Sequence, residues 1–259
     1  MQLDSHKRKQ IIIAVIFFVI IGALGFLIFR AVLPPKIIPT PNPTANLLPI
    51  QVIYSKLFNI QNNDYDFLAK VRNPNNEYGS GDVSYEIEAY DSSDKLISSR
   101  DGNFYILPGQ TKYVILTPLR FTPTGSRVEF MIKTIAWEKL DPLSAGGSKL
   151  ITKNVDFSSI AGPNLFAKVG GSVANASDFD FDIVDVSVVA FDGSGEPVAV
   201  GRTDIRTFLS KTERGFEVSW FSPFVGQVTS VDAEATTNVF NNLNFIRRFS
   251  RQQRFQQRY

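Results

Sequence analysis

The stretch that decides the fold is Val83-Ser84-Tyr85-Glu86-Ile87-Glu88-Ala89-Tyr90, in which apolar and polar side chains alternate. Successive side chains of a β-strand point to opposite faces of a sheet, so this alternation predicts a half-buried strand. A second stretch, DFDFDI at 178–183, alternates in the same way. Both favour strands over helices.

Turn-forming residues separate such stretches throughout the chain. The clearest runs are Asn73-Pro74-Asn75-Asn76, Asp91-Ser92-Ser93-Asp94, Pro108-Gly109 and Asp192-Gly193-Ser194-Gly195. Short strands with turns every ~8–12 residues are typical of antiparallel β-sandwiches. No segment of 50–240 has the pattern of a long amphipathic helix. We therefore expect a mainly β fold of immunoglobulin-like antiparallel β-sandwich domains.

The strand-rich part contains pairs of similar words that indicate a tandem repeat. FLAKV at 67–71 resembles LFAKV at 165–169, and AYDSSDKLI at 89–97 resembles AFDGSGEPV at 190–198. A third pair is Thr117-Pro118-Leu119 and Ser222-Pro223-Phe224. Three landmarks in one order at similar offsets favour a duplicated domain, with chance similarity of short words as the alternative.

The N-terminal region predicts a membrane anchor. Residues 11–29 (IIIAVIFFVIIGALGFLIF) contain no charged or strongly polar side chain. As a helix this run would span about 28 Å, close to the hydrocarbon thickness of a bilayer. A cleaved signal peptide is the rival interpretation, but the run is longer than usual and no small-x-small cleavage site follows it.

Charge around the predicted helix suggests its orientation. Lys7, Arg8 and Lys9 precede it, whereas Arg30 and Lys36 follow it. By the positive-inside rule, residues 1–10 are expected to be a cytoplasmic tail and the rest to lie outside. The predicted location is the plasma membrane, crossed once, with the lipid bilayer as a partner of residues 11–29.

The remaining boundaries follow from composition. Residues 30–49 contain six prolines and predict an extended stalk. Domain 1 is expected at 50–139 and domain 2 at 150–240. Between them, 140–149 contains Pro142, Gly146 and Gly147 and predicts a linker, while 241–259 predicts a basic tail.

Composition argues against an enzyme. The chain has no cysteine, and its single histidine, His6, precedes the predicted helix. The folded part therefore lacks thiolate nucleophiles, cysteine metal sites and the commonest general base. We expect no catalytic residue, no cofactor and no metal site.

Several short motifs resemble known families. Ile87-Glu88-Ala89-Tyr90-Asp91, followed by Leu107-Pro108-Gly109-Gln110-Thr111, resembles bacterial FxLYD domains. Val71-Arg72-Asn73-Pro74-Asn75 is similar to the signature of the WHy domains of late-embryogenesis-abundant proteins. The second copy keeps Phe191-Asp192 but has Leu209-Ser210-Lys211 in place of Pro-Gly. The resemblance, closer over 50–138 than over 150–240, implies small immunoglobulin-like sandwiches without enzymatic activity, often on membrane-anchored proteins.

Three groups of side chains in the body are candidate sites, each with a structural alternative. The first group could form a calcium site or could simply be the solvated face of one strand: Asp178, Asp180, Asp182 and Asp185. Glu86 and Glu88 could be a carboxylate pair for glycoside hydrolysis or two exposed residues on the polar side of one strand. Six aromatic residues could form a flat surface that binds carbohydrate or could pack in the cores: Tyr85, Tyr90, Tyr105, Tyr113, Trp137 and Trp220.

The ends of the chain are basic and its middle is acidic. Residues 1–36 carry a net charge of +4 and residues 241–259 a net charge of +5, which leaves −7 for 37–240. The tail interleaves its arginines with Phe245, Phe249, Phe255 and Tyr259. Guanidinium groups and aromatic rings suit phosphate-bearing targets. The candidate contact residues are Arg247, Arg248, Arg251, Arg254 and Arg258.

Three alternatives remain open for this tail: a solubilising end, a contact with anionic lipid headgroups or another anionic polymer, and a contact with protein. No specific nucleic-acid recognition is expected. For the whole chain we expect a membrane-anchored, extracytoplasmic structural or interaction protein. It would serve as a scaffold or accessory subunit of a cell-envelope assembly, with other envelope proteins as partners. The alternative is an envelope glycan- or polyanion-binding module.

Overall fold

A computed structural model describes Phe18 and residues 46–61, 63–121, 125–140, 149–160, 162, 165–224, 226–243 and 245. The chain divides into two compact units, Met1–Ala45 and Asn46–Tyr259. In the first unit only Phe18 is described, and it is helical. Among the described residues, no helix has both the length and the apolar character needed to cross a bilayer. The predicted tail at 1–10 and the rest of the predicted 11–29 helix lie outside the described residues, as does most of the stalk.

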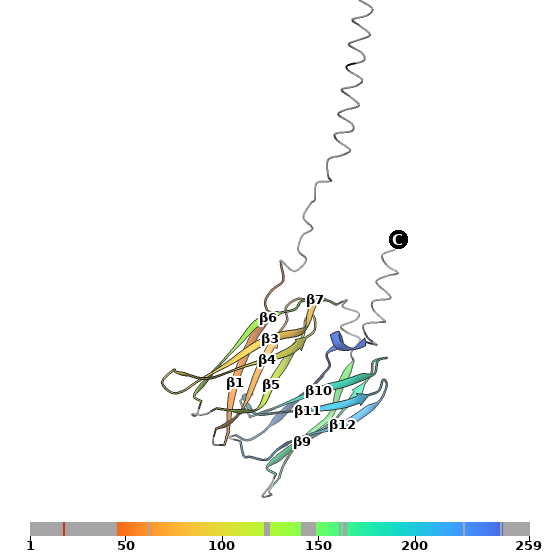
Figure 1. Cartoon of the computed structure of the whole chain (residues 1–259). Coiled ribbons are helices and arrows are strands. Elements are labelled where there is room, and N and C mark those ends of the chain that lie inside the picture. Colours follow the sequence, from red (N-terminus) through yellow and green to blue (C-terminus); the bar gives the residue numbers. More distant parts are fainter. Residues whose placement is uncertain are drawn as a thin grey trace, which may run out of the picture. The chain divides into compact units, whose positions relative to one another are not determined.

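The strands of the described residues all belong to the second unit, and they form two β-sandwiches (Figure 1). The first sandwich consists of β1 (Gln51–Gln61), β2 (Asp64–Arg72), β3 (Tyr78–Tyr90), β4 (Leu96–Ile106), β5 (Thr111–Arg120), β6 (Arg127–Ile135) and β7 (Glu138–Lys139). The second sandwich consists of β8 (Leu150–Ser159), β9 (Ala167–Asn175), β10 (Phe181–Phe191), β11 (Pro197–Phe208), β12 (Glu213–Trp220) and β13 (Ser230–Thr236). A 3₁₀ turn, η1 (Val239–Asn241), follows β13.

The two sandwiches have the same strand order. In the first, one sheet has the order β1-β2-β5 and the other β4-β3-β6, with β7 pairing the start of β3. In the second, the sheets are β8-β9-β12 and β11-β10-β13. All pairs are antiparallel. The mainly β, antiparallel fold predicted from the sequence is confirmed, and the repeated strand order supports a duplication.

The alternation at 83–90 gives the core of the first sandwich. Val83, Ile87 and Ala89 are completely buried, Tyr85 is 5% exposed, and all four belong to one core cluster with Tyr65, Phe67, Ala69 and Val71 of β2. Trp137 packs against the same core from its edge. Burial of one full face of β3 is what the period-two pattern predicts.

The second predicted alternation changes phase inside its strand. Phe179 and Phe181 are buried as expected, but Ile183 is 48% exposed and Val184 is buried instead. Thr207, which lies opposite Asp182 on β11, has a φ of 52°. The left-handed conformation is uncommon for a β-branched residue, and the change of face in β10 coincides with it.

One buried asparagine occupies the same place in each sandwich. Asn73 Nδ2 donates to the carbonyl oxygens of Tyr78 (2.7 Å) and Leu107 (2.9 Å). Asn175, 102 positions later, donates to those of Phe179 (2.8 Å) and Leu209 (3.1 Å). Both side chains are 0–1% exposed. Each asparagine therefore links carbonyl groups of two loops through one buried amide, as buried polar side chains usually do.

This equivalence corrects two of the three repeat landmarks. FLAKV and LFAKV lie 98 positions apart, and Thr117 and Ser222 lie 105 apart, whereas the pair β2-β5 repeats in β9-β12 at 102 and the pair β3-β4 repeats in β10-β11 at 101. The landmark at Asp91 and Asp192 is correct, because both residues accept hydrogen bonds from backbone N–H groups two and four residues later. Short words shared by two strands are weaker markers than the turn residues between strands.

The expected boundary at residue 240 is wrong. Phe245 is 1% exposed in the core of the second sandwich, where its ring lies 5.0 Å from that of Phe179. Asn242 Nδ2 donates to the Asp180 carbonyl oxygen, and Asn242 Oδ1 accepts from Phe245 N. The second sandwich therefore includes Phe245, which is not available to stack on a ligand. Within the expected linker, 141–148 lies outside the described residues.

Candidate functional site between the two sandwiches

An apolar cluster joins the outer face of β2 and β5 to the outer face of β10 and β11. Its buried members are Phe58, Leu68, Tyr113 and Ile115 from the first sandwich and Val189 and Val200 from the second. The sequence signal for this contact is a pair of apolar runs without alternation, Phe67-Leu68-Ala69 and Val188-Val189-Ala190. Such runs indicate strands buried on both faces. Sequence reasoning missed it and expected two separable domains.

Tyrosines of the first sandwich bind acids of the second beside this cluster. The Tyr113 hydroxyl donates to Asp232 Oδ2 (2.9 Å), and the Tyr113 backbone N–H donates to Glu234 Oε2 (2.9 Å). The Tyr105 hydroxyl donates to Asp185 Oδ2 (2.8 Å). Burial and the adjacent carboxylates raise the pKa of both tyrosines, so their hydroxyls stay protonated and can donate.

Lys112 is buried in the middle of this polar contact. Its ammonium lies 3.6 Å from the centroid of the Tyr105 ring, and among the described residues no carboxylate oxygen is within ion-pair distance. Burial lowers the pKa of Lys112 to about 8, although the nearby charges of Glu234 and Asp185 oppose the shift. Burial also raises the pKa of Glu234. A cavity of about 180 Å³ lies here, lined by Tyr105, Lys112, Asp185 and Arg202 among others.

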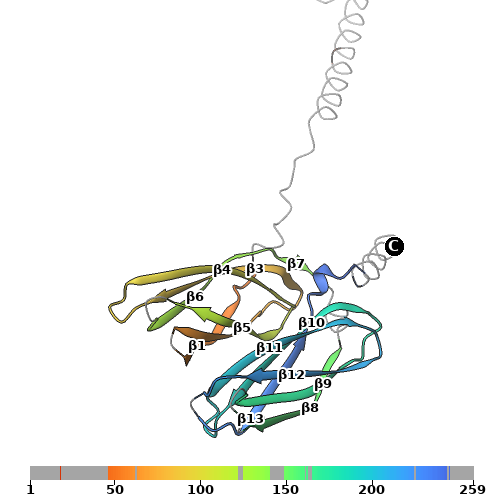
Figure 2. The ribbon, with the colours of Figure 1, turned by 60° about the horizontal axis from the view of Figure 1, so that its bottom comes forward.

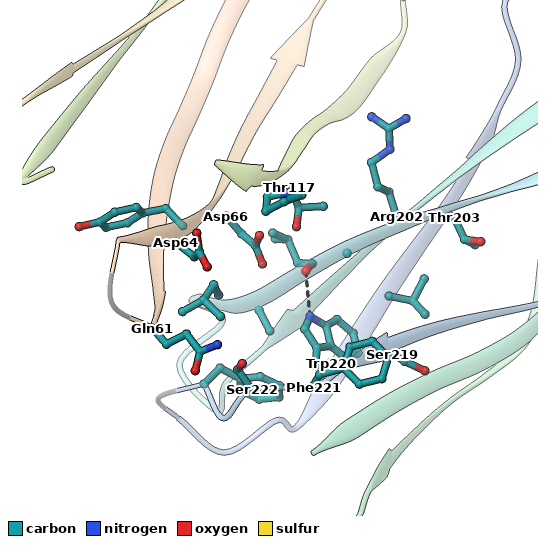
Figure 3. Close-up of a pocket in the computed structure, with 18 of the residues that line it drawn as sticks. Gln61, Asp64, Asp66, Thr117, Arg202, Thr203, Ser219, Trp220, Phe221 and Ser222 are labelled. Carbon is teal, nitrogen blue, oxygen red and sulfur yellow. Dashed lines mark hydrogen bonds between the residues drawn. The ribbon is translucent and has the colours of Figure 1, made fainter. Parts of the chain in front are cut away.

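A larger groove of about 430 Å³ opens between the sandwiches near the ends of β1, β5 and β12. Figure 3 shows Asp66 and Thr117 on the wall of the first sandwich and Trp220 and Phe221 on the wall of the second. The Trp220 indole N–H donates to the Val200 carbonyl oxygen (2.8 Å), which fixes that wall. Phe221 is 72% exposed.

Asp66 is the unusual residue of this groove. The residue is 7% exposed, and burial raises the pKa of its carboxyl group, although the Thr117 side chain opposes the shift. The neighbouring Asp64 is different, since it forms a two-pronged ion pair with Arg120 at 2.7 and 3.0 Å, which lowers its pKa. A buried carboxylate can accept several hydrogen bonds. The groove therefore offers acceptor capacity to a ligand beside an exposed aromatic ring.

The acidic strand does not act as a unit. Asp178, Asp180 and Asp182 are exposed, as the solvated-face interpretation predicts. Asp178 pairs with Lys211 (2.8 Å), and Asp180 Oδ1 accepts from Ser210 N. Asp185 departs from that prediction, because it binds Tyr105 at the junction. Within the described part of the chain, no group of three or more acidic or histidine side chains is placed to hold a metal ion.

The carboxylate pair on β3 is engaged by neighbours. Glu86 pairs with Lys133 (2.6 Å) and accepts from Ser99, which lowers its pKa. Glu88 accepts from the Tyr90 hydroxyl (2.5 Å). Of the six aromatic residues, Tyr85 and Trp220 belong to cores and Tyr105 and Tyr113 to the junction, so they form no common platform. All five candidate arginines of the tail lie outside the described residues.

No protein-family model matches this chain, and no curated protein matches it. Two solved structures that resemble parts of it are large enzymes. A glycosyl hydrolase family 2 member from Bacteroides cellulosilyticus is 11% identical, with 67% of this chain and 28% of that one covered and a TM-score of 0.23. Red sea bream transglutaminase is 10% identical, with 73% and 29% covered and a TM-score of 0.26. This chain spans less than a third of either protein, and a likeness this distant carries no argument about function.

Proposed function

We propose that this chain is a membrane-anchored, non-enzymatic interaction protein whose two immunoglobulin-like sandwiches form one rigid body outside the cytoplasm. The junction is the observation that carries this proposal. It combines an apolar cluster with hydrogen bonds from Tyr105 and Tyr113 to three acids. Breaking such a contact would expose apolar surface and leave buried polar groups unpaired, so the sandwiches are expected to move together.

The remaining parts of the proposal rest on the sequence. Residues 11–29 anchor the chain in the plasma membrane with the N-terminus in the cytoplasm, and the proline-rich stalk separates the body from the bilayer. The likeness to FxLYD and WHy domains is consistent with a role in binding other envelope proteins. The absence of cysteine and histidine from the sequence of the folded body favours binding over catalysis. The body serves as a scaffold or accessory subunit of an envelope assembly.

Crosslinking in intact native cells tests this proposal. Photo-crosslinkers placed on exposed positions of both sandwiches are expected to capture other envelope proteins, and protease added to spheroplasts should degrade the body and spare residues 1–10. A version with the junction broken by Ile115→Glu should anchor normally but lose partners that contact both sandwiches. Capture of cytoplasmic proteins alone, or a body protected from external protease, would contradict the proposed location.

A second candidate function is glycan binding in the groove. The observation in its favour is the pair formed by Asp66, a buried acceptor, and Phe221, an exposed ring. Sugar hydroxyls donate to carboxylates, and the apolar faces of sugar rings pack on aromatic side chains. Binding of the full-length protein to an array of envelope glycans should be weakened at least tenfold by Asp66→Asn and left unchanged by Asp101→Asn, a control on the exposed face of β4.

A further inference from the structure

An ammonium group is buried without an acceptor where the two sandwiches meet. Lys112 is 6% exposed, and its ammonium makes no hydrogen bond and no ion pair with any residue that the structure describes. An ammonium has three N–H donors and a full charge, and buried charges in proteins are normally paired or hydrogen-bonded because isolation is costly. The Tyr105 ring beside it offsets only part of this cost, since a ring face stabilises a cation but accepts no ordinary hydrogen bond.

Lys112 lies at an edge of the first sandwich that the second sandwich covers. Its strand β5 is the last strand of one sheet, and β4, which contains Tyr105, is the last strand of the other. Figure 2 shows β5 beside β11 and β10 of the second sandwich. The cavity of about 180 Å³ at this place therefore has walls from both sandwiches. A ligand in the cavity would contact both.

Arg202 supplies a second positive charge to the cavity from the opposite wall. It is paired with Ser187 across β10 and β11, two positions along each strand from Val189 and Val200 of the junction cluster. Side chains two positions apart lie on the same face of a strand, so Ser187 and Arg202 face the first sandwich. Figure 3 shows the Arg202 side chain pointing away from Trp220. In the described part of the chain, Arg202 takes part in no ion pair and the Ser187 hydroxyl in no hydrogen bond.

The two cations repel each other across the cavity. Burial lowers the pKa of Lys112 to about 8, and the charge of Arg202 acts in the same direction. The acids of the junction lie nearby but are engaged, because Asp185 and Glu234 each accept a hydrogen bond from the first sandwich. A negatively charged acceptor between the two cations would supply the missing hydrogen bonds and remove the repulsion.

We propose that this cavity binds a small monovalent oxyanion of the carboxylate type, which accepts hydrogen bonds from Lys112 and Arg202 and thereby links the two sandwiches. The inference goes beyond the proposed interaction function, because it assigns a small ligand to the junction itself. Two observations carry it: a buried ammonium that has no acceptor among the described residues, and a second cation that faces the same cavity from the other sandwich.

Volume and charge restrict the ligand. A cavity of about 180 Å³ is larger than one water molecule needs, and it accommodates an anion of a few atoms such as formate or acetate. A carboxylate also matches a guanidinium group, which can donate two parallel hydrogen bonds to it. Asp185 lines the same cavity and Glu234 lies close to Lys112, so a second negative charge on the ligand would be repelled. The site is therefore expected to discriminate against sulfate.

Saturation-transfer NMR of formate tests this site on the full-length protein in detergent micelles. Formate has a single proton signal, which takes up magnetisation from the protein only while the anion is bound. Transfer to formate should saturate in the millimolar range, and acetate should displace formate from the site. Sulfate at the same ionic strength should displace formate at least fivefold less effectively than acetate does. Micelles without protein give the background.

Substitutions on the two walls distinguish this site from general binding of anions to the protein surface. Lys112→Met and Arg202→Gln should each weaken formate binding at least fivefold, whereas Asp185→Asn should strengthen it by removing a repelling charge. The matched controls are Lys95→Met, at an exposed position, and Arg206→Gln, farther along β11 and in an ion pair of its own. Both controls should bind formate as the natural protein does. Thermal unfolding verifies first that each variant is folded.

Loss of transfer in both wall variants, with both controls unchanged, would establish the site. No transfer in the natural protein, or equal transfer in the natural protein, Lys112→Met and Arg202→Gln, would overturn the proposal, and the cavity would then hold only water. Displacement of formate by sulfate as effectively as by acetate would contradict a monovalent ligand. If Lys112→Met does not fold, Arg202→Gln decides the result, because the Arg202 side chain is exposed and its loss leaves the core intact.

Discussion

The two sandwiches share their strand order and differ in which face is apolar. In the first, Leu68 pairs in register with Ile115 on the sheet that meets the second sandwich. The equivalent pair in the second, 102 positions later, is Gly170 and Glu217, and this sheet does not contribute to the junction cluster. The outer face of a sandwich is thus free to vary, and it becomes apolar where a neighbour covers it.

The second sandwich shows the same rule on its other sheet. It meets the first through Val189 and Val200, which are paired on β10 and β11. Their counterparts in the first sandwich, Glu88 and Ser99, are also paired but polar. The junction therefore joins two non-equivalent faces. Head-to-tail contacts of this kind can repeat in principle. The two faces that remain carry Glu217 and Glu88 at the equivalent positions.

The largest effect on stability is expected when the residue types of the junction face and of the equivalent exposed face are exchanged. Ile115→Glu places a carboxylate in the apolar cluster, with an expected loss of more than about 4 kcal/mol of unfolding free energy. Calorimetry of the full-length protein should show one transition for the natural sequence and two for the variant. The matched exchange at the equivalent exposed position, Glu217→Ile, should change stability by less than about 0.5 kcal/mol. Similar effects at the two positions would contradict the difference between the faces.

The buried asparagines test the part that the sandwiches share. Asn73→Ala and Asn175→Ala each remove a buried amide that donates to two carbonyl groups and accepts from a backbone N–H, with an expected loss of about 3 kcal/mol in urea unfolding. The two losses should agree within about 1 kcal/mol, because each amide donates to carbonyl groups on two loops and accepts from the backbone N–H two residues later. Asn59→Ala, on the exposed side of β1, is the control. A large effect at only one asparagine would show that the copies are no longer equivalent.

A pH series tests the smallest effect, at Lys112. Its pKa in the folded state is about 8, against 10.5 for a free lysine, so burial of the charged form costs stability at all pH values below about 8. Stability should rise as pH increases from 8 to 9.5, by at most about 2 kcal/mol. Above pH 10 the tyrosines obscure the trend. Lys112→Met should remove the rise and Lys95→Met should not; a rise that survives Lys112→Met would assign it to another group.

The sequence was sufficient to predict the strands and insufficient to predict how the sandwiches meet. Alternation at 83–90 is a local property, because it depends only on the two faces of one strand. The junction depends on Leu68 and Val189, which are far apart in the chain and lie in runs that read as ordinary core strands. Phe245 was assigned to the tail because arginines follow it, although its ring closes a core. Asn175 lacks the Pro-Asn context of Asn73, which hid the shared asparagine.

The central claim is that the two sandwiches form one rigid body, and a distance measurement between them tests it most directly. Spin labels at Ser93→Cys and Ser194→Cys occupy exposed turns, one on each sandwich, in a chain without natural cysteines. Pulsed electron resonance on the full-length protein should give one narrow distance distribution, and Ile115→Glu should broaden it. A broad distribution in the otherwise natural sequence, unchanged by Ile115→Glu, would contradict the account and describe two independent domains.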